Sequence, residues 1–443
     1  MKLYDTFHDL LQAGSEVGRR RPRVDGVQNV TGSRKFVDDL HLPNMLRCKG
    51  VYSKSPHAKI EVDTHKAERF PGVRAVITAE DFPHNRYRED IPDHPCLAEG
   101  KVRYIGEWIA VVAAETEDIA EEAAGLIDVE YEELPAIFDP RDAMEPGAPV
   151  IHEEFPDNLV PFAKNIQRCQ IRSGDIEKGF SHADHVFEHT FTSQVQEHAY
   201  LEPHAALAEV DEMGRLTIWS VTQTPFLHAV NVAGTLNLPL AKTRVIAVQG
   251  GGSFGGKNAP SLGPHVALLA FKTRRPVKWA WTLEEEMQCW DTRHAYIMKH
   301  RTGVKNDGRI VAKKIEAICD NGAYTVWGCR QMHKHAILGC GPYRVPNYWF
   351  DGYLVYTNKQ PGSAFRGFGV AQSTWASDSQ MDIIARELGM DPLEFRIINC
   401  LREGDRGQTG SKLRTVGIEK CLRKVAELSG WKINGQNHEG ATL

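Results

Sequence analysis

The sequence predicts a mixed α and β (α+β) fold in more than one domain, and three observations support this prediction. Short β-branched, apolar runs alternate with segments of helical periodicity along most of the chain. The chain has 443 residues, whereas a single hydrophobic core rarely grows beyond about 250. Prolines recur between residues 140 and 161 at a spacing that is incompatible with long helices or central strands. We therefore place a domain boundary in that stretch.

Four segments follow from this boundary. We expect an irregular arm over residues 1–23, a compact α/β domain over 24–140, a linker over 141–171 and a larger α+β domain over 172–443. In the first domain, Thr116 can cap a helix that Gly125 ends, because acidic residues in its first turn suit the helix dipole. Alternating apolar and polar residues then predict a half-buried strand over residues 127–132.

Strand-like runs come first in the larger domain. They cover residues 186–191, 216–221, 244–248 and 277–281. The run over residues 244–248 is β-branched and apolar enough to predict a buried strand.

Two helices are predicted near the C-terminus. Helical periodicity covers residues 371–388, where Gly389 ends the helix, and residues 418–428. The apolar or small face of the first helix is Val370, Thr374, Ser377, Met381, Ile384 and Leu388. The apolar face of the second is Ile418, Cys421, Leu422, Val425 and Leu428.

Composition and charge exclude several classes of protein. The formal net charge is −5, so the chain lacks the basic surface that nucleic acids or anionic membranes require. The longest apolar run, residues 108–114, is far shorter than the roughly 20 residues of a membrane helix, and we expect a cytoplasmic protein. Nine cysteines without a C-x-x-C spacing indicate no disulfide framework, zinc site or iron–sulfur cluster on this chain.

A glycine-rich loop over residues 249–258 is the most unusual stretch of the sequence. Its string, QGGGSFGGKN, follows the predicted strand at 244–248 and prevents regular continuation of that strand. The lack of side chains at its glycines therefore indicates that another group, from the protein or from a ligand, lies close to the backbone of this loop. A tight turn without any ligand is the simplest interpretation.

Three motifs overlap on this loop. Gly250, Gly252 and Gly255 fit the dinucleotide pattern G-x-G-x-x-G, although an acidic residue at the end of the next strand comes late. The phosphate-loop pattern fits through Lys257, but Asn258 stands where a magnesium-binding hydroxyl belongs. Read as a G-x-S-x-G nucleophile elbow, the loop offers Ser253, with Asp291 and His294 as a later acid and histidine.

Two further stretches carry more polar and aromatic residues than packing requires. The first is QEHAYLEPH over residues 196–204, whose buried polar side chains would all need partners. The second is AFRGFG over residues 364–369, where Arg366 precedes a predicted helix start and could help to bind an anion.

Together, the three stretches resemble the molybdenum-binding subunit of the xanthine dehydrogenase family, the molybdenum hydroxylases. The resemblance extends from about residue 24 to residue 405 and includes TGSRKFVDDL at 31–40, SPHA at 55–58 and YEELP at 131–135. It implies an N-terminal α/β hammerhead-like domain followed by a molybdopterin-binding α+β domain. It also implies oxidation of an N-heteroaromatic compound, nicotinate- or purine-like, with water as the oxygen source.

The resemblance assigns roles to individual residues. Gln196 is similar to the glutamine that hydrogen-bonds an oxygen ligand of molybdenum, and Gly252, Phe254 and Gly255 to the loop that passes the cofactor. Arg366 is similar to the arginine near the ligands of the metal. We expect Gln196 and Arg366 to be catalytic. Phe368 resembles the aromatic that packs on the substrate ring, and Asn258 stands where xanthine-oxidising members usually hold a glutamate, which makes substrates other than xanthine at least as suitable.

The departures from the family pattern predict partners. Family subunits usually carry a later glutamate in a G-x-G-E string as the general base, and this chain has no such string. We therefore expect the first half of a split subunit, as in nicotinate dehydrogenase-like enzymes, with the glutamate on a second polypeptide. The resemblance further implies molybdenum–molybdopterin in its cytosine dinucleotide form, and iron–sulfur and FAD subunits that accept the electrons.

Two functions from other classes remain open. A serine hydrolase would use Ser253, and an NAD-dependent dehydrogenase would use the loop of Gly250, Gly252 and Gly255. The sequence leaves open which heterocycle or aldehyde is the substrate, whether the metal carries a sulfido or selenido ligand, the subunit stoichiometry and the direction of the reaction.

Overall fold

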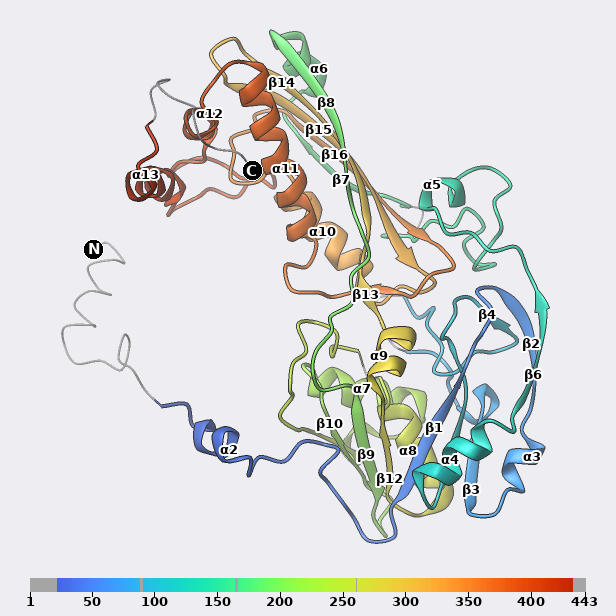
Figure 1. The fold of residues 1–443 in the computed structure, drawn as a ribbon. Coiled ribbons are helices and arrows are strands. Elements are labelled where there is room, and N and C mark those ends of the chain that lie inside the picture. The colour runs from blue at the N-terminus through green and yellow to red at the C-terminus, as the bar shows by residue number, and fades with distance from the viewer. Residues whose placement is uncertain (1–21, 88–90, 164–165, 260, 433–443) are drawn as a thin grey trace.

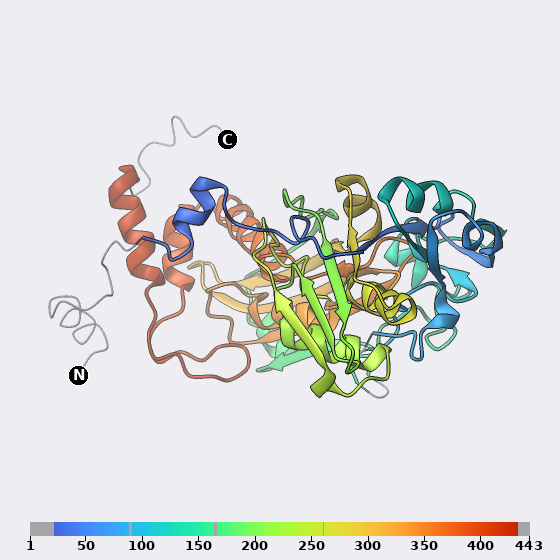
Figure 2. The same cartoon turned by 90° about the horizontal axis from the view of Figure 1, so that it is seen from below.

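The computed structural model describes residues 22–87, 91–163, 166–259 and 261–432. It has two lobes, each built on one large sheet (Figure 1). Seen from below, the red C-terminal helices lie at one end of the molecule and the teal elements, at about residues 101–135, at the other (Figure 2). The arm predicted over residues 1–23 lies almost entirely outside the described residues. Within them, no helix is both long and apolar enough to cross a bilayer.

The lower lobe in Figure 1 contains a mixed sheet of seven strands. In spatial order they are β11 (Thr243–Ala247), β10 (Leu216–Ser220), β9 (Ala205–Val210), β12 (Val277–Ala280), β1 (Leu46–Tyr52), β5 (Trp108–Ala114) and β3 (Val73–Ile77). The strand β5 is buried along its whole length because it lies between β1 and β3 and is covered by helices.

This sheet crosses the predicted domain boundary. β1 pairs in parallel with β12, so that Leu46 lies opposite Val277. The first and the larger predicted domains therefore share one sheet. The described part of the predicted linker is largely irregular and contains most of the short helix α5 (Pro140–Ala143) and the first residues of β7 (Cys169–Ser173). The boundaries between domains remain a prediction from sequence.

Helices cover both sides of the seven-stranded sheet. α8 (Gly263–Thr273) packs on β9 and β12, and α4 (Glu117–Ala124) packs on β1 and β5. Thr116 caps α4 as predicted, because its hydroxyl accepts a hydrogen bond from the backbone N–H of Ile119. The other helices of this lobe are α2 (Gly26–Thr31), α3 (His65–Glu68), α7 (Pro225–Thr235) and α9 (Leu283–Cys289). A small sheet of β4 (Lys101–Val102), β2 (Ala58–Asp63) and β6 (Asp128–Glu133) lies beside them.

The upper lobe is a five-stranded sheet with helices on it. Its strands, in spatial order, are β7 (Cys169–Ser173), β16 (Tyr348–Tyr356), β15 (Ile310–Gly322), β14 (Tyr296–Val304) and β8 (His185–Ser193). α10 (Gly328–Leu338) packs on β16 and α11 (Val370–Glu387) on β14 and β8. The remaining helices are α6 (Ile176–Ser181), α12 (Pro392–Asn399) and α13 (Ile418–Ser429).

A cluster of tryptophans forms part of the core of the lower lobe. The Trp108 ring lies 5.8 Å from Trp279, 5.0 Å from Trp281 and 5.7 Å from Trp290, measured between ring centroids. The indole N–H of Trp290 donates to the carbonyl of Gly256 at 2.6 Å. The glycine loop is thus anchored directly to a rigid aromatic core.

A buried polar joint connects the two lobes. The Glu107 carboxylate accepts hydrogen bonds from the backbone N–H of Arg103 and from the hydroxyl of Tyr324, and the Arg103 guanidinium donates to the Tyr324 oxygen at 3.2 Å. The Asn358 amide donates to the carbonyl of Arg103 at 2.9 Å. All four residues are buried and none of them has a buried side-chain polar atom without a partner.

Three expectations from sequence are wrong. β11 is not buried, because it is an edge strand that pairs only with β10. In α11, Thr374 faces solvent while Gln372 and Ser373 are buried, although Gly389 ends the helix as predicted with a φ of +69°. In α13, only Ala426 is buried, and Val425 and Leu428 are 62% and 75% exposed.

Candidate functional site

The three stretches singled out from the sequence meet at the junction of the two lobes. Arg293, in the two-residue strand β13 (Thr292–Arg293), donates its backbone N–H to the carbonyl of Gln196 at 2.8 Å. Its guanidinium Nη2 donates to the carbonyl of Arg366 at 2.9 Å. The backbone N–H of Arg366 in turn donates to the carbonyl of Phe254 at 2.7 Å. β13 lies between the lobes in Figure 1.

The glycine loop needs its glycines to fit against the other two stretches. A Cβ on Gly255 would lie 2.3 Å from the carbonyl oxygen of Ala364, and one on Gly252 would lie 2.8 Å from the Cβ of Tyr200. Both glycines have positive φ, at 115° and 119°. The close approach that the sequence predicted is therefore made, at these two positions, by the protein itself.

Lys257 does not act as a phosphate-loop lysine. Its side chain is fully buried, where Nζ donates to the carbonyl of Glu202 at 2.6 Å and lies 4.4 Å from the centre of the Tyr200 ring. Asn258 is half-buried, and its backbone carbonyl accepts from the hydroxyl of Thr224 at 2.6 Å. Within the described residues, no hydrogen bond connects Asn258 to Gln196, Arg366 or Phe368.

The geometry also disfavours the two alternative functions. No hydrogen bond joins Ser253, His294 and Asp291 in the described part of the chain, so these residues form no catalytic triad there. The loop also does not open a helix at Gly255. The next helix, α8, begins only at Gly263, whereas the dinucleotide motif places its phosphates at a helix start directly after the loop.

Arg366 lies on a tight turn just before α11. Gly367 has a φ of 101° and Phe368 a φ of 43°, and the N–H of Phe368 donates to the carbonyl of Phe365 at 2.8 Å. Non-glycine residues rarely adopt a positive φ, and such strain is concentrated at functional sites. Phe254, on the glycine loop, also has a positive φ of 48°. The guanidinium of Arg366 lies 5.2 Å from the centre of its ring.

The exposed groups at this junction are an amide, a guanidinium and a phenyl ring. Gln196 and Arg366 are exposed, Phe254 is 38% exposed and Phe368 is half-buried. Among the described residues, neither Arg366 nor Arg293 has a carboxylate within ion-pair distance. A positively charged surface with an amide donor and no internal counter-ion suits an anionic group, as a molybdenum cofactor with its phosphates and oxygen ligands is.

A cluster of buried titratable groups lies behind the exposed ones. The imidazole Nε2 of His198 donates to the carbonyl of Ala364 at 2.8 Å, while its Nδ1 lies 3.8 Å from the Glu197 carboxylate. Burial lowers the pKa of His198, but Glu197 and the charge of Asp291 outweigh it, so the pKa is raised. Burial raises the pKa of the Asp291 carboxyl to about 7. Among the residues that the structure describes, Oδ1 of Asp291 and both carboxylate oxygens of Glu197 have no hydrogen-bond partner.

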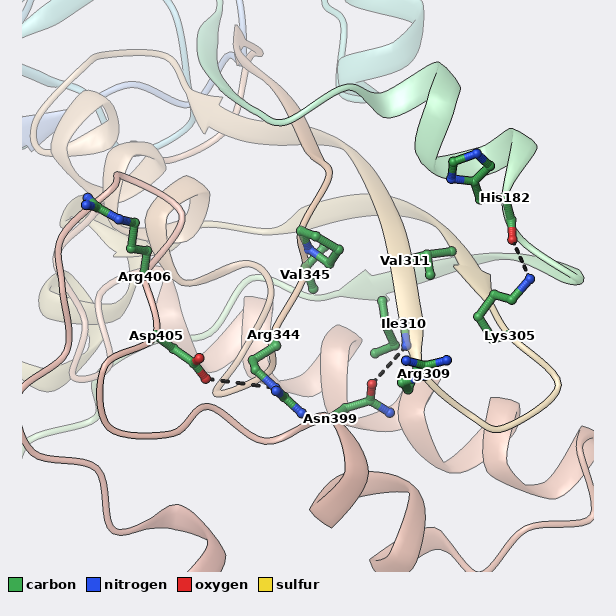
Figure 3. A pocket seen from close by; sticks show the side chains of 11 residues that line it. His182, Lys305, Arg309, Ile310, Val311, Arg344, Val345, Asn399, Asp405 and Arg406 are labelled. Carbon is green, nitrogen blue, oxygen red and sulfur yellow. Dashed lines mark hydrogen bonds and ion pairs between the residues drawn. The ribbon is translucent and has the colours of Figure 1, made fainter.

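A separate hollow of about 600 Å³ lies in the upper lobe and contains none of these residues. Figure 3 shows its basic lining, which includes Lys305, Arg309 and Arg344. Each of these cations has an acidic neighbour: Asp184 at 2.7 Å, Asp307 at 2.7 Å and Asp405 at 3.8 Å, respectively. Its positive charge is therefore largely compensated, and the junction of the three stretches is the better candidate site.

Sequence reasoning placed Gln196, the glycine loop and Arg366 but missed Arg293. The structure brings the first three together through backbone hydrogen bonds, whereas it makes no such connection to Asn258. Arg293 lies in the run WDTRHAY, which has no motif, and a strand of two residues has no periodicity to detect. His198 was inside a highlighted stretch and could have been identified as one of its buried polar residues.

Comparisons with known proteins concern almost the whole chain. The family model described as a molybdopterin cofactor-binding domain matches residues 151–400. The model described as the a/b hammerhead domain of aldehyde oxidase and xanthine dehydrogenase matches residues 31–135.

Individual relatives fall into two length classes. The large molybdopterin subunit of nicotinate dehydrogenase from Eubacterium barkeri is 38% identical over 424 residues, which cover 94% of this chain and 98% of that subunit. A probable xanthine dehydrogenase subunit from Bacillus subtilis is 39% identical over 92% of this chain but only 54% of its own length. The solved structure of an aldehyde oxidoreductase from Desulfovibrio gigas has a TM-score of 0.88 at 32% identity, and the match covers 93% of this chain and 46% of that one.

Proposed function

This chain belongs to the aldehyde oxidase and xanthine dehydrogenase family of molybdopterin-binding proteins, and on that premise we propose that it is the cofactor-binding first half of a split molybdenum hydroxylase subunit. The observation that carries the proposal is the meeting of the stretches around Gln196, Phe254 and Arg366 at one exposed, cationic junction. The nearly complete coverage of the large molybdopterin subunit of nicotinate dehydrogenase, against about half of longer relatives, supports the split arrangement.

We assign the residues of this chain to positions around the cofactor. When bound, the molybdenum cofactor supplies the redox and oxygen-transfer chemistry. The Gln196 amide and the Arg366 guanidinium are both exposed, and Arg293 donates a hydrogen bond to the backbone carbonyl of each residue. These two side chains would hold anionic groups of the cofactor. Gly252, Phe254 and Gly255 form the loop that borders the cofactor, and Phe368 offers a phenyl face to a flat substrate ring.

The substrate that we propose is an N-heteroaromatic compound, with nicotinate favoured over xanthine. The large molybdopterin subunit of nicotinate dehydrogenase is a relative that this chain covers almost completely. Asn258 also stands where a carboxylate would serve xanthine, and an amide provides a weaker, uncharged hydrogen bond. We further propose the cytosine dinucleotide form of the cofactor, and partner chains that carry the general-base glutamate, the iron–sulfur clusters and FAD.

The test is the metal content and composition of the complex isolated from its host through a tag on this chain. Elemental mass spectrometry should find about one molybdenum per chain, together with a second polypeptide, because we propose that a partner chain supplies the general-base glutamate. The loaded complex should then reduce an artificial electron acceptor with nicotinate and incorporate ¹⁸O from labelled water into the product. A complex without molybdenum would contradict the proposal, and turnover of aldehydes alone would contradict the substrate class.

A further inference from the structure

Arg293 hydrogen-bonds two of the predicted site residues, Gln196 and Arg366. Its backbone N–H binds the carbonyl of Gln196 at 2.8 Å, and its Nη2 binds the carbonyl of Arg366 at 2.9 Å. Its strand β13 also pairs with β17 (Gly362–Ser363), which leads directly into the turn that holds Arg366. One residue therefore connects the two residues to which we assign the cofactor's polar contacts.

The same guanidinium packs on the neighbour of Arg366. It lies 3.9 Å from the centre of the Phe365 ring, against which the imidazole of His198 also stacks at 4.4 Å between centroids. His198 is fixed in turn, because its Nε2 donates to the carbonyl of Ala364. Residues 364–366 are thus held by contacts from both Arg293 and His198.

The contacts of the Arg293 side chain are not those expected of a residue that only stabilises the fold. The Nη1 of Arg293 is buried and has no acceptor among the described residues, and a buried donor without an acceptor destabilises the folded state. No carboxylate among the described residues pairs with the guanidinium either. A structural arginine would be expected to have acceptors for its buried N–H groups and a carboxylate nearby. Arg103 has both in the joint between the lobes.

We propose that Arg293 is a positioning residue of the cofactor site, which fixes the backbone of Gln196 and of Arg366 relative to each other. The inference depends on the proposed function, because it takes these two residues as the polar contacts of the cofactor. A displacement of about 1 Å in such a group can lower a rate by about 100-fold. Arg293 itself acts through its neighbours and is not assigned a contact with the substrate.

The test compares three variants of the whole complex. Arg293→Met removes the hydrogen bond to Arg366 and the charge but keeps an unbranched side chain, and Arg293→Lys keeps the charge. Arg301→Met is the matched control, because Arg301 also lies over a phenyl ring, that of Phe180 at 4.4 Å, but belongs to the exposed side of β14 in the upper lobe. For each we would measure molybdenum content, thermal midpoint, kcat and KM, the Mo(V) EPR spectrum, and hydrogen exchange in residues 362–370.

We expect Arg293→Met to lower kcat per molybdenum by about 10-fold or more, with a smaller change in KM, an altered Mo(V) spectrum and faster exchange in residues 362–370. Arg293→Lys should recover part of kcat, and Arg301→Met should match the wild type throughout. Unchanged kcat per molybdenum and unchanged exchange in Arg293→Met would overturn the inference. Absence of molybdenum from the wild-type complex would instead overturn the proposed function, and with it this role of Arg293.

Discussion

The joint between the lobes and the candidate site use the same kinds of side chain in opposite ways. In the joint, Arg103, Glu107 and Tyr324 are buried and their polar atoms are all paired. At the candidate site, Arg293 and Asp291 each have a buried polar atom that finds no partner in the described part of the chain. Paired buried groups hold a fold together, whereas unpaired ones reduce stability unless another molecule or a reaction uses them. The unpaired atoms at the candidate site agree with its assignment as a ligand site, and buried atoms without a partner also occur elsewhere in the described residues, as in His300 and His335.

The contrast between the joint and the candidate site predicts its largest effect at Asp291, where the free energy of unfolding should depend on pH. Its folded pKa of about 7 lies above the value of 3.8 for a free side chain, because burial disfavours the charged form. The folded state then binds this proton more tightly, so the stability that the neutral carboxyl permits is present near pH 4 and is lost as pH rises to about 7. Asp291→Asn keeps the neutral shape without the titration.

We therefore expect the unfolding free energies of Asp291→Asn and wild type to agree best near pH 4. They should diverge by up to roughly 4 kcal/mol at pH 8, with the variant more stable. Denaturant unfolding of both proteins at several pH values measures this. Parallel curves across the whole range would mean that the Asp291 carboxyl is not held neutral, and the contrast between the two regions would weaken.

Mutations in the joint between the lobes should change the free energy of unfolding but not the catalytic rate. Glu107→Ala removes the carboxylate that accepts from the backbone N–H of Arg103 and from the hydroxyl of Tyr324, and a buried donor left without an acceptor typically costs about 1–3 kcal/mol. We expect the free energy of unfolding to fall by about that amount while kcat per bound molybdenum stays within about twofold of wild type. If kcat fell together with stability, the joint and the site would not be separable.

Mutations at the candidate site should lower the catalytic rate but change the stability of the fold little. Gln196→Ala and Arg366→Ala each remove an exposed side chain that makes no hydrogen bond or ion pair with another described residue, so the thermal midpoint should change little. We expect kcat to fall by at least about 10-fold, because each variant removes a positioned polar group at the metal. Steady-state kinetics of molybdenum-loaded complexes is the measurement. Full activity in both variants would indicate that the cofactor contacts lie on another chain.

The smallest expected effect is at Ser253. It lies on the glycine loop without a hydrogen bond to His294 in the described residues, so no base activates it. A fluorophosphonate probe should not label the chain, and the isolated chain should not bind NAD measurably in calorimetry. Labelling that Ser253→Ala abolishes would revive the hydrolase and remove the main argument for the cofactor site.

Local features of this fold were predictable from the sequence, and non-local ones were not. The cap at Thr116 and the end of α11 at Gly389 follow from residue chemistry within one turn, and both predictions are confirmed. The edge position of β11 depends on which strands join the sheet, so a β-branched run cannot reveal it. The exposed face of α13 likewise has the same pattern that a buried face would have.

The residues of the candidate site were also predictable where they belong to a local motif and not predictable where they depend on distant contacts. The stretches around Gln196, Phe254 and Arg366 were placed by resemblance, and the structure brings them together through short backbone hydrogen bonds. The roles of these residues remain predictions until a loaded complex is measured. Arg293 could not be predicted from the sequence. It donates hydrogen bonds to two carbonyl groups that lie nearly 100 and more than 70 residues away along the chain.

The pairing of β1 with β12 has a consequence for the way in which the chain folds. Leu46 finds its partner only at Val277, and four strands of the same sheet lie between residues 205 and 280. Closing a loop of that length must precede the contacts that reward it, so folding should be slow relative to small domains. During synthesis the ribosome would release the edge of β1 long before β12 exists, and chaperones would have to protect that edge until then.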